Sequence, residues 1–287
     1  MRPPRHRSLP LVVGVDAGGT WIRLRAQRGA RNVARRTVRA SVMQDVPSFL
    51  RSEWERRGWT RAGVAALVVA ARGTWTAPER RALRRRLAPL ARRVRVMSDV
   101  EGAWHGALGD VPGVLVLAGT GSIVLGRDAA GRWARTGGLG PLVGDEGSAF
   151  WLGREWLRRT PRAAGTARRL ARSPAAVAQI AGLAPSVLAR ARRREPAAIR
   201  VVGEGQRRLA EQAADVARRL RLPGCFTVSW AGAVMSDPWF RAGLRRALGR
   251  LGVRAHWQPP AGEPVDAATR AAARLASPGD GPPGSRR

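Results

Sequence analysis

Lysine and tyrosine are absent from this chain of 287 residues, and cysteine occurs once, as Cys225. Without lysine, Schiff-base catalysis, ordinary pyridoxal-phosphate chemistry, a Walker A loop and the usual protein-kinase lysine are excluded. One cysteine excludes an internal disulfide, a cysteine-based zinc finger and an iron–sulfur cluster held by a single chain. No apolar run approaches the roughly 18 residues of a membrane-spanning helix, so we expect no membrane partner.

Negative charge is scarce, because 20 acidic residues stand against 52 basic ones, all of them arginine. The chain is also rich in Ala, Gly, Pro and Trp, which is the pattern of a very GC-rich coding sequence. We therefore attribute much of the net charge of +32 to composition. Arg84–Arg86 and Arg192–Arg194 lack interleaved aromatic residues and are interpreted as solvated helix faces, which disfavours nucleic-acid binding.

The length fits about two domains of roughly 100–200 residues each, and 44% hydrophobic residues suffice for sizeable cores. Arg2, Arg5 and Arg7 precede a short apolar run that resembles the start of a signal peptide. That run ends at Asp16 without a small-residue cleavage site. We interpret it as a buried first strand and expect a cytoplasmic protein.

Two segments show the same pattern of apolar strand, glycine turn and returning strand. The first joins residues 11–15 to 21–26 through Asp16–Thr20, and the second joins residues 111–118 to 123–126 through Gly119–Ser122. Their spacing of about 100 residues predicts a duplicated α/β domain.

The remaining periodicities predict further strands and a mainly helical second half. The expected strands are 65–71, 94–97 and 225–230, and the expected helices are 78–93, 99–108, 199–220, 239–251 and one starting at Pro264. Residues 277–287 are rich in Pro and Gly, which predicts a disordered tail.

The two glycine turns are candidate phosphate sites. Backbone N–H groups in such turns form a small concavity, and Gly18 and Gly19 let a ligand approach without a Cβ in the way. Thr20 adds a hydroxyl, and Asp16 can hold a hydrated Mg²⁺ ion. Each turn taken alone is also explained as a tight β-turn, but two matching turns favour phosphate binding.

Asp99 stands where a predicted strand ends and a helix begins. One interpretation is an N-cap, and the other is a general base, because ligands collect at the carboxyl ends of strands. Such a base contributes roughly 10²–10⁴-fold by taking a proton from an attacking hydroxyl. The sequence leaves both roles open, and they can coexist.

Residues 137–148 form a glycine-rich stretch around the acidic pair Asp145 and Glu146. A backbone wall for a ligand is one interpretation, with the carboxylates binding sugar hydroxyls or a metal; a solvated acidic turn is the other. We interpret His105 as a packed helix residue and Cys225 as an inert buried thiol.

The order of these segments is specific although each is weak alone. Residues 16–20, 98–99, 118–122, 137–140, 144–148 and 230–234 together resemble the N-acetylglucosamine kinase branch of the BadF/BadG/BcrA/BcrD ATPase family, within the sugar kinase, Hsp70 and actin superfamily. The resemblance runs from about Leu11 to Ala276. It implies two ribonuclease-H-like α/β domains, residues 11–118 and 119–276, after a tail of residues 1–10. It also implies ATP, Mg²⁺ and a sugar in an interdomain cleft.

The resemblance also implies roles for particular residues. The positions that match nucleotide-binding motifs are Asp16, Gly18, Gly19 and Thr20 for the first phosphate motif, Gly119, Thr120 and Gly121 for the second, and Ala231, Gly232 and Ala233 for adenosine. The positions that match substrate contacts are Asp99 as catalytic base, Thr120, and Gly138, Asp145 and Ala149 in the amino-sugar pocket.

Several positions depart from the family pattern. Ala233 replaces a glycine of the adenosine motif, and Leu139 replaces an aromatic residue of the sugar pocket. Ala71-Arg72 stands where Ser or Gly is usual, an expected Asn has no counterpart around residues 41–43, and Asp266 replaces part of a Gly-Ala pair. The phosphate-handling segments are thus better preserved than the sugar-reading ones.

We expect an ATP-dependent kinase that phosphorylates a small sugar such as N-acetylglucosamine or glucosamine, using ATP and Mg²⁺. A non-catalytic or ATPase-only sensor of the same fold is the main alternative. A dehydratase activator of the same family needs at least two cysteines per subunit, and Cys225 stands alone. A nucleic-acid binder ranks last, and the oligomeric state is left open between a monomer and a homodimer.

Overall fold

The computed structural model describes residues 9–40 and 45–277, which form two compact units. The first unit comprises the residues up to Gly106 and those from Gly262 onward, and the second comprises Ala107–Ala261. Most of both expected tails, and the segment around residues 41–43, lie outside the described residues. Among the helices of the described part, none is long and apolar enough to cross a membrane.

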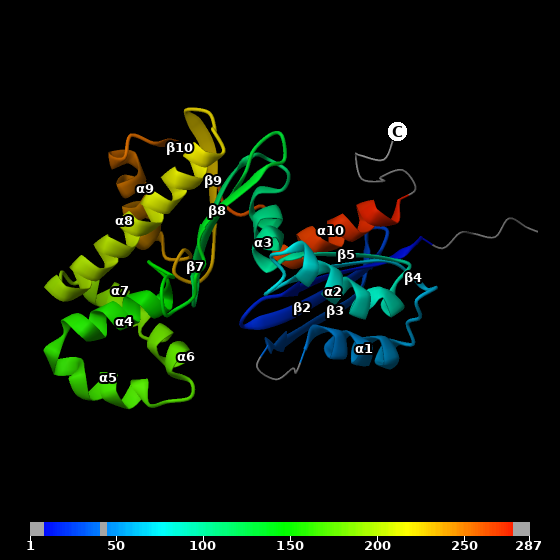
Figure 1. Ribbon diagram of the computed structural model, residues 1–287, viewed down its shortest axis with the longest axis horizontal. Coiled ribbons are helices and arrows are strands. Elements are labelled where there is room, and N and C mark those ends of the chain that lie inside the picture. The colour runs from blue at the N-terminus through cyan, green and yellow to red at the C-terminus, as the bar shows by residue number, and fades with distance from the viewer. Residues whose placement is uncertain (1–8, 41–44, 278–287) are drawn as a thin grey trace, which may run out of the picture. The chain divides into compact units, whose positions relative to one another are not determined.

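The first unit contains a five-stranded sheet of order β3-β2-β1-β4-β5 (Figure 1). β1 (Leu11–Ala17), β2 (Trp21–Arg28) and β3 (Arg31–Arg39) form an antiparallel meander. β4 (Val64–Ala71) and β5 (Arg93–Ser98) run parallel to β1. β1 and β4 are almost wholly apolar because both faces of the sheet centre are covered.

Helices cover both faces of this sheet. Side chains of α1 (Val46–Arg57) and α2 (Ala77–Leu87) pack with Val13 and Val15 of β1 in one cluster. The neighbouring residue Val12 points to the opposite face and packs with α10 (Pro264–Ala276). A short 3₁₀ turn, Ala88–Leu90, follows α2, and α3 (Asp99–Leu108) follows β5.

The second unit repeats this topology in the order β10-β9-β6-β7-β8. β6 (Gly113–Ala118), β7 (Ser122–Arg127) and β8 (Trp133–Gly137) form the meander. β9 (Cys225–Ala231) and β10 (Arg254–Trp257) run parallel to β6. The predicted α/β class and the predicted repetition of the hairpin are confirmed.

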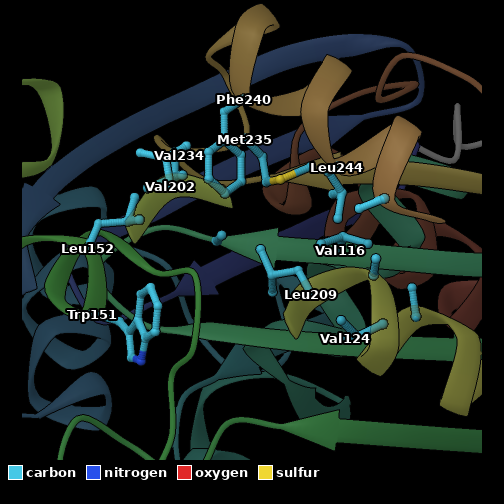
Figure 2. Packing of buried hydrophobic residues seen from close by; sticks show 14 of the residues in the cluster. Val116, Val124, Trp151, Leu152, Val202, Leu209, Val234, Met235, Phe240 and Leu244 are labelled. Carbon is cyan, nitrogen blue, oxygen red and sulfur yellow. The ribbon is translucent and has the colours of Figure 1, made fainter. Parts of the chain in front are cut away.

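The core of the second unit lies between one sheet face and several helices. Figure 2 shows Val116 of β6 and Val124 of β7 beside side chains of α4 (Ala149–Arg159), α8 (Pro196–Arg219) and α9 (Pro238–Arg250). Additional short elements complete this unit: a 3₁₀ turn Pro161–Ala163, α5 (Ala164–Ala171), α6 (Ala176–Ala181) and α7 (Ala184–Arg192).

The units differ from the expected domains 11–118 and 119–276. A boundary after Ala118 would separate β6 from β7, whose hydrogen-bonded ladder makes them one hairpin. α10 belongs to the first unit, because Gly14 of β1 leaves room for Thr269; a Cβ on Gly14 would lie 2.3 Å from the Thr269 backbone nitrogen. The second unit is therefore inserted into the first.

Local differences have local causes. The helix expected over residues 78–93 ends at Leu87, because the chain tightens into the 3₁₀ turn around Pro89 before β5. Cys225, expected to be buried, is exposed, because it is the first residue of β9. The individual elements β3, β8, β10, α1 and α4 to α7 were not predicted.

Candidate functional site

Asp16 is a buried carboxylate near the carboxyl end of β1. Its Oδ2 lies 3.2 Å from Nη1 of Arg23 on the adjacent strand β2. Burial raises the pKa of Asp16 to about 6, although the Arg23 guanidinium acts in the opposite direction; the nearby carboxylates of Asp99 and Glu263 raise it further. Asp16 is therefore largely ionised at neutral pH but close to its titration range.

The turn after β1 does not require its glycines for folding. Gly18 donates its backbone N–H to the Trp21 carbonyl at 3.1 Å, yet neither Gly18 nor Gly19 has a positive φ. A Cβ on Gly18 would meet its first atom at 3.8 Å, which is ordinary contact. Because the backbone conformation does not call for glycine here, close approach of a ligand is the better reason for it.

Asp99 lies at the same sheet edge as Asp16. The parallel register places Ala17 beside Ala71 and Ala71 beside Ser98, so β1, β4 and β5 end together. Asp99 follows as the first residue of α3. The structure thus brings together the first phosphate motif and the expected base, both within the first unit.

Capping of α3 is done by the neighbours of Asp99. The Glu101 backbone N–H donates to Ser98 Oγ at 3.1 Å, and the Ser98 N–H donates to Glu101 Oε2 at 2.8 Å. This reciprocal pair is a capping box. Asp99 itself accepts the local N–H of Val100, at 3.0 Å to Oδ1, and its own backbone N–H also acts on its carboxyl. The N-cap interpretation of Asp99 therefore does not fit the structure.

Burial raises the pKa of the half-buried Asp99 carboxyl, while the Val100 N–H and the nearby Arg72 guanidinium lower it. A carboxylate with a raised pKa accepts a proton more readily at neutral pH. The ionised carboxylate of Asp99 is stabilised by its place in the first turn of α3, because the helix N-terminus carries partial positive charge.

In the second unit, the turn after β6 is tied to the start of α4. Gly119 and Thr120 accept the backbone N–H groups of Ala149 and Phe150 at 2.8 and 3.3 Å. Ser148 caps α4 by accepting the Trp151 N–H. The exposed Thr120 and the predicted pocket residue Ala149 are thereby held next to each other.

The predicted adenosine motif lies against the same turn. Gly232 has a φ of 94°, and a Cβ on it would lie 2.4 Å from the Ala118 carbonyl oxygen, so only glycine fits. The Val234 N–H donates to that oxygen at 3.0 Å. Ala231 is half-buried and Ala233 is exposed beside the turn. The second phosphate motif and the adenosine motif therefore form one surface.

The glycine-rich loop also closes on this turn. Asp145 is buried with a φ of 60°, and its Oδ2 would lie 2.8 Å from a Cβ on Gly121. Gly138 donates its N–H to the carbonyl of Ser122, the residue after the turn, at 3.0 Å. A carboxylate in this rare backbone conformation is typical of functional sites.

The two acidic residues of this loop, Asp145 and Glu146, have different surroundings. Asp145 faces the turn, whereas Glu146 Oε2 accepts a hydrogen bond from Gln212 of α8 at 3.1 Å. Within the described parts of the chain, no group of three or more His, Cys, Asp or Glu side chains is arranged for a metal.

Sequence reasoning missed three charged neighbours of the candidate residues in the first unit. Arg23 pairs with Asp16, Glu263 acts on Asp16 electrostatically, and Arg72 lies near Gly19 and acts electrostatically on Asp99. Arg72 was visible only as a departure from the family pattern. No sequence pattern indicated Glu263, because it comes near Asp16 only through the packing of α10 on β1.

Two sheets of the same order, each with a glycine turn after its first strand, define a duplicated α/β protein of the ribonuclease-H-like class. More particularly, the chain belongs to the BadF/BadG/BcrA/BcrD ATPase family, which matches residues 13–245.

Solved structures share the whole fold. A Chromobacterium violaceum protein proposed as an N-acetylglucosamine kinase is 24% identical with a TM-score of 0.68, covering 94% of this chain and 99% of that one. A Porphyromonas gingivalis protein with the same proposed activity is 20% identical with a TM-score of 0.70, covering 92% and 99%. At these identities the likeness shows the fold.

A curated relative matches over a shorter stretch. The N-acetylmuramic acid/N-acetylglucosamine kinase of Clostridium acetobutylicum is 44% identical over 61 residues, which is 21% of this chain and 20% of the relative. The match thus spans about a fifth of that protein's length.

Proposed function

We propose that this protein is an ATP-dependent kinase that transfers the γ-phosphoryl group to a hydroxyl of an amino sugar such as N-acetylglucosamine or glucosamine. The observation that carries the proposal is the state of Asp99. Its carboxylate lies after β5, at the same end of the sheet as the first glycine turn, and the capping box of Ser98 and Glu101 relieves it of helix capping. The family and the named activities of the relatives support the same reaction.

Nucleotide binding is assigned to the glycine turns of both units. The turn at Gly18–Thr20 and the turn at Gly119–Gly121 would bind phosphates through backbone N–H groups, and the surface at Ala231–Ala233 would bind adenosine. No lysine is required for these contacts.

Asp16 fits a Mg²⁺ ion. A lone carboxylate oxygen is the kind of protein ligand that Mg²⁺ takes when nucleotide phosphates and water complete its shell. The metal, when bound, neutralises charge on the phosphates. The cost of keeping Asp16 ionised in its buried position, expressed in its pKa of about 6, would fall beside a cation.

Asp99 would act as the general base. Its carboxylate takes the proton of the sugar hydroxyl as the hydroxyl oxygen forms a bond to the γ-phosphorus. The bond from that phosphorus to the β–γ bridging oxygen breaks, and ADP leaves with the electron pair. Holding the reacting groups in position supplies most of the catalysis in phosphoryl transfer, because the protein itself does little covalent chemistry.

The sugar would contact Thr120, Gly138, Asp145 and Ala149 beside the second turn. Asp145 is the strongest of these candidates, since its buried carboxylate can accept hydrogen bonds from sugar hydroxyls. Leu139, which replaces the family's aromatic residue, is 70% exposed. The pocket therefore lacks an aromatic wall at that position.

The decisive experiment measures ADP release with a panel of N-acetylglucosamine, glucosamine, N-acetylmannosamine and glucose, against sugar-free hydrolysis. Sugar-dependent release with a phosphorylated product is expected. Asp99→Asn should lower kcat by about 10³-fold while ATP binds nearly as before, because only the proton acceptor is lost. Glu55→Gln, a change at an exposed carboxylate of α1, is the matched control.

Two results would count against the proposal. Hydrolysis that no sugar accelerates would favour the ATPase-only or sensor alternative, for which Leu139 and Ala233 are the supporting departures. Full phosphorylation by Asp99→Asn would refute the role of Asp99.

A further inference from the structure

Arg72 is held at the sheet edge by its backbone. It follows the last residue of β4, and its N–H donates to the carbonyl of Ala17 at 3.0 Å, directly before the first glycine turn. Thr74 fixes the rest of this loop, because its Oγ1 donates to the carbonyls of Ala71 and Met97 at 2.7 and 2.9 Å. The backbone that carries the Arg72 side chain is therefore held in place by hydrogen bonds.

The guanidinium of Arg72 lies over the turn. Its Nη1 would be 3.2 Å from a Cβ on Gly19, so a larger residue at position 19 would displace it. The same guanidinium acts electrostatically on Asp99 across the edge. The Arg72 guanidinium is thus close to the predicted phosphate-binding turn and acts on the predicted base.

Arg72 is exposed and, within the described residues, forms no ion pair, unlike three other arginines of the first unit. Arg23 pairs with Asp16, Arg25 with Asp266 and Arg80 with Glu101. Across residues 9–40 and 45–277, no carboxylate lies within ion-pairing distance of Arg72. An exposed guanidinium at the carboxyl ends of the strands, next to the glycine turn and without an ion pair in the described residues, is suited to bind an incoming anion.

We propose that Arg72 binds the γ-phosphoryl group of ATP and stabilises it during transfer, so that this lysine-free chain supplies a fixed side-chain cation from the loop after β4. The inference rests on the proposed kinase function. The planar guanidinium donates to two oxygens of the phosphoryl group while the sugar oxygen–phosphorus bond forms and the bond to ADP breaks. The hydroxyl proton goes to Asp99, and Arg72 gains and loses no proton.

The test compares Arg72→Ala and Arg72→Lys with Arg84→Ala, a change at an exposed arginine of α2. Dissociation constants for ATP and ADP are measured by calorimetry, and kcat by ADP release. For Arg72→Ala we expect ATP to bind about 10-fold more weakly with ADP within about 2-fold of wild type, and kcat to fall about 10²–10³-fold. Lysine should restore part of kcat, since it supplies charge without the fork, and Arg84→Ala should match wild type.

The pH profile gives a second readout. Removing the cation beside Asp99 raises the pKa of that carboxyl further, so the acid limb of kcat/KM should move to higher pH in Arg72→Ala.

The outcomes separate the two proposals. If Arg72→Ala loses kcat and shifts the pH profile but keeps its preference for ATP over ADP, Arg72 only positions Asp99 and the inference is wrong. If wild type transfers no phosphoryl group to any sugar, the kinase proposal fails. The loss of ATP-over-ADP preference in Arg72→Ala would still establish the contact with the terminal phosphate, and an unchanged preference would refute it.

Discussion

The two units share one strand order but divide the candidate chemistry unequally. The first unit presents charge at its sheet edge, in Asp16, Arg72 and Asp99. The second unit presents mainly backbone groups. They come from the Gly119–Gly121 turn, the Gly232 turn packed against it and the loop that carries Asp145. One topology can therefore supply proton transfer or ligand enclosure, depending on which residues follow its strands.

The glycines of the two units also differ, in whether their backbone conformation requires glycine. Gly18 and Gly19 have ordinary φ angles, so the fold of the first unit does not demand them. Gly138 and Gly232 have φ angles of 71° and 94°, so the second unit needs them to fold as it does. Substitutions should separate a ligand-driven glycine from a fold-driven one.

The largest effect on stability is expected for Gly232→Ala in the second unit. The added Cβ would overlap the Ala118 carbonyl, and the left-handed backbone disfavours any L side chain. The free energy of unfolding should fall by about 3 kcal/mol in urea titrations. Gly224→Ala, at a glycine with open space around it, should cost less than about 1 kcal/mol. Equal losses would remove the distinction.

Asp16→Asn should change the pH dependence of stability in the first unit. Because the folded pKa of about 6 lies above the unfolded value, wild type binds the extra proton when folded and loses relative stability as pH rises through this window. The variant lacks this penalty. Its free energy of unfolding relative to wild type should increase by about 2–3 kcal/mol from pH 4 to pH 7.5. A pH-independent difference would contradict the raised pKa.

Ser98→Ala tests whether capping and catalysis are separate. Losing the Ser98 half of the capping box should cost about 1 kcal/mol by thermal or urea unfolding. The variant should keep the acid limb of its pH–rate profile, because Asp99 keeps its own groups. A large loss of kcat with normal stability would mean that Ser98 belongs to the reaction.

The smallest effect on stability is expected for Gly18→Ala. Its Cβ would meet only ordinary contacts, so the free energy of unfolding should change by less than about 0.5 kcal/mol. ATP should nevertheless bind about 10-fold more weakly by calorimetry, because the methyl group occupies the space assigned to phosphate. Unchanged affinity would assign this turn to the fold alone.

Sequence periodicity was sufficient for the buried elements. Both hairpins and α8 were predicted because their apolar residues repeat at the strand or helix period. β3 was missed, because an arginine-rich edge strand with only Ala34 buried shows no such period. β10 is only four residues long. The packing of α10 on β1 depends on a close approach at Gly14, which no local pattern reveals.

The candidate site was predicted in a similarly uneven way. Asp16, Asp99 and the turns follow strand ends, so motif order identified them. The relation between Asp145 and Gly121 arises from a loop that folds back from 24 residues along the chain. No sequence pattern indicated a role for Arg72. Its position near Gly19, without an ion pair in the described residues, is known only from the structure.

The insertion of Ala107–Ala261 between the two parts of the first unit sets an order of events during synthesis. The ribosome synthesises the whole inserted segment before α10, so the face of β1 around Gly14 stays uncovered until α10 has been made. Nascent chains stalled before Pro264 would hold a complete second unit beside an unfinished first one, and Asp16 would lack the surroundings that tune its acidity.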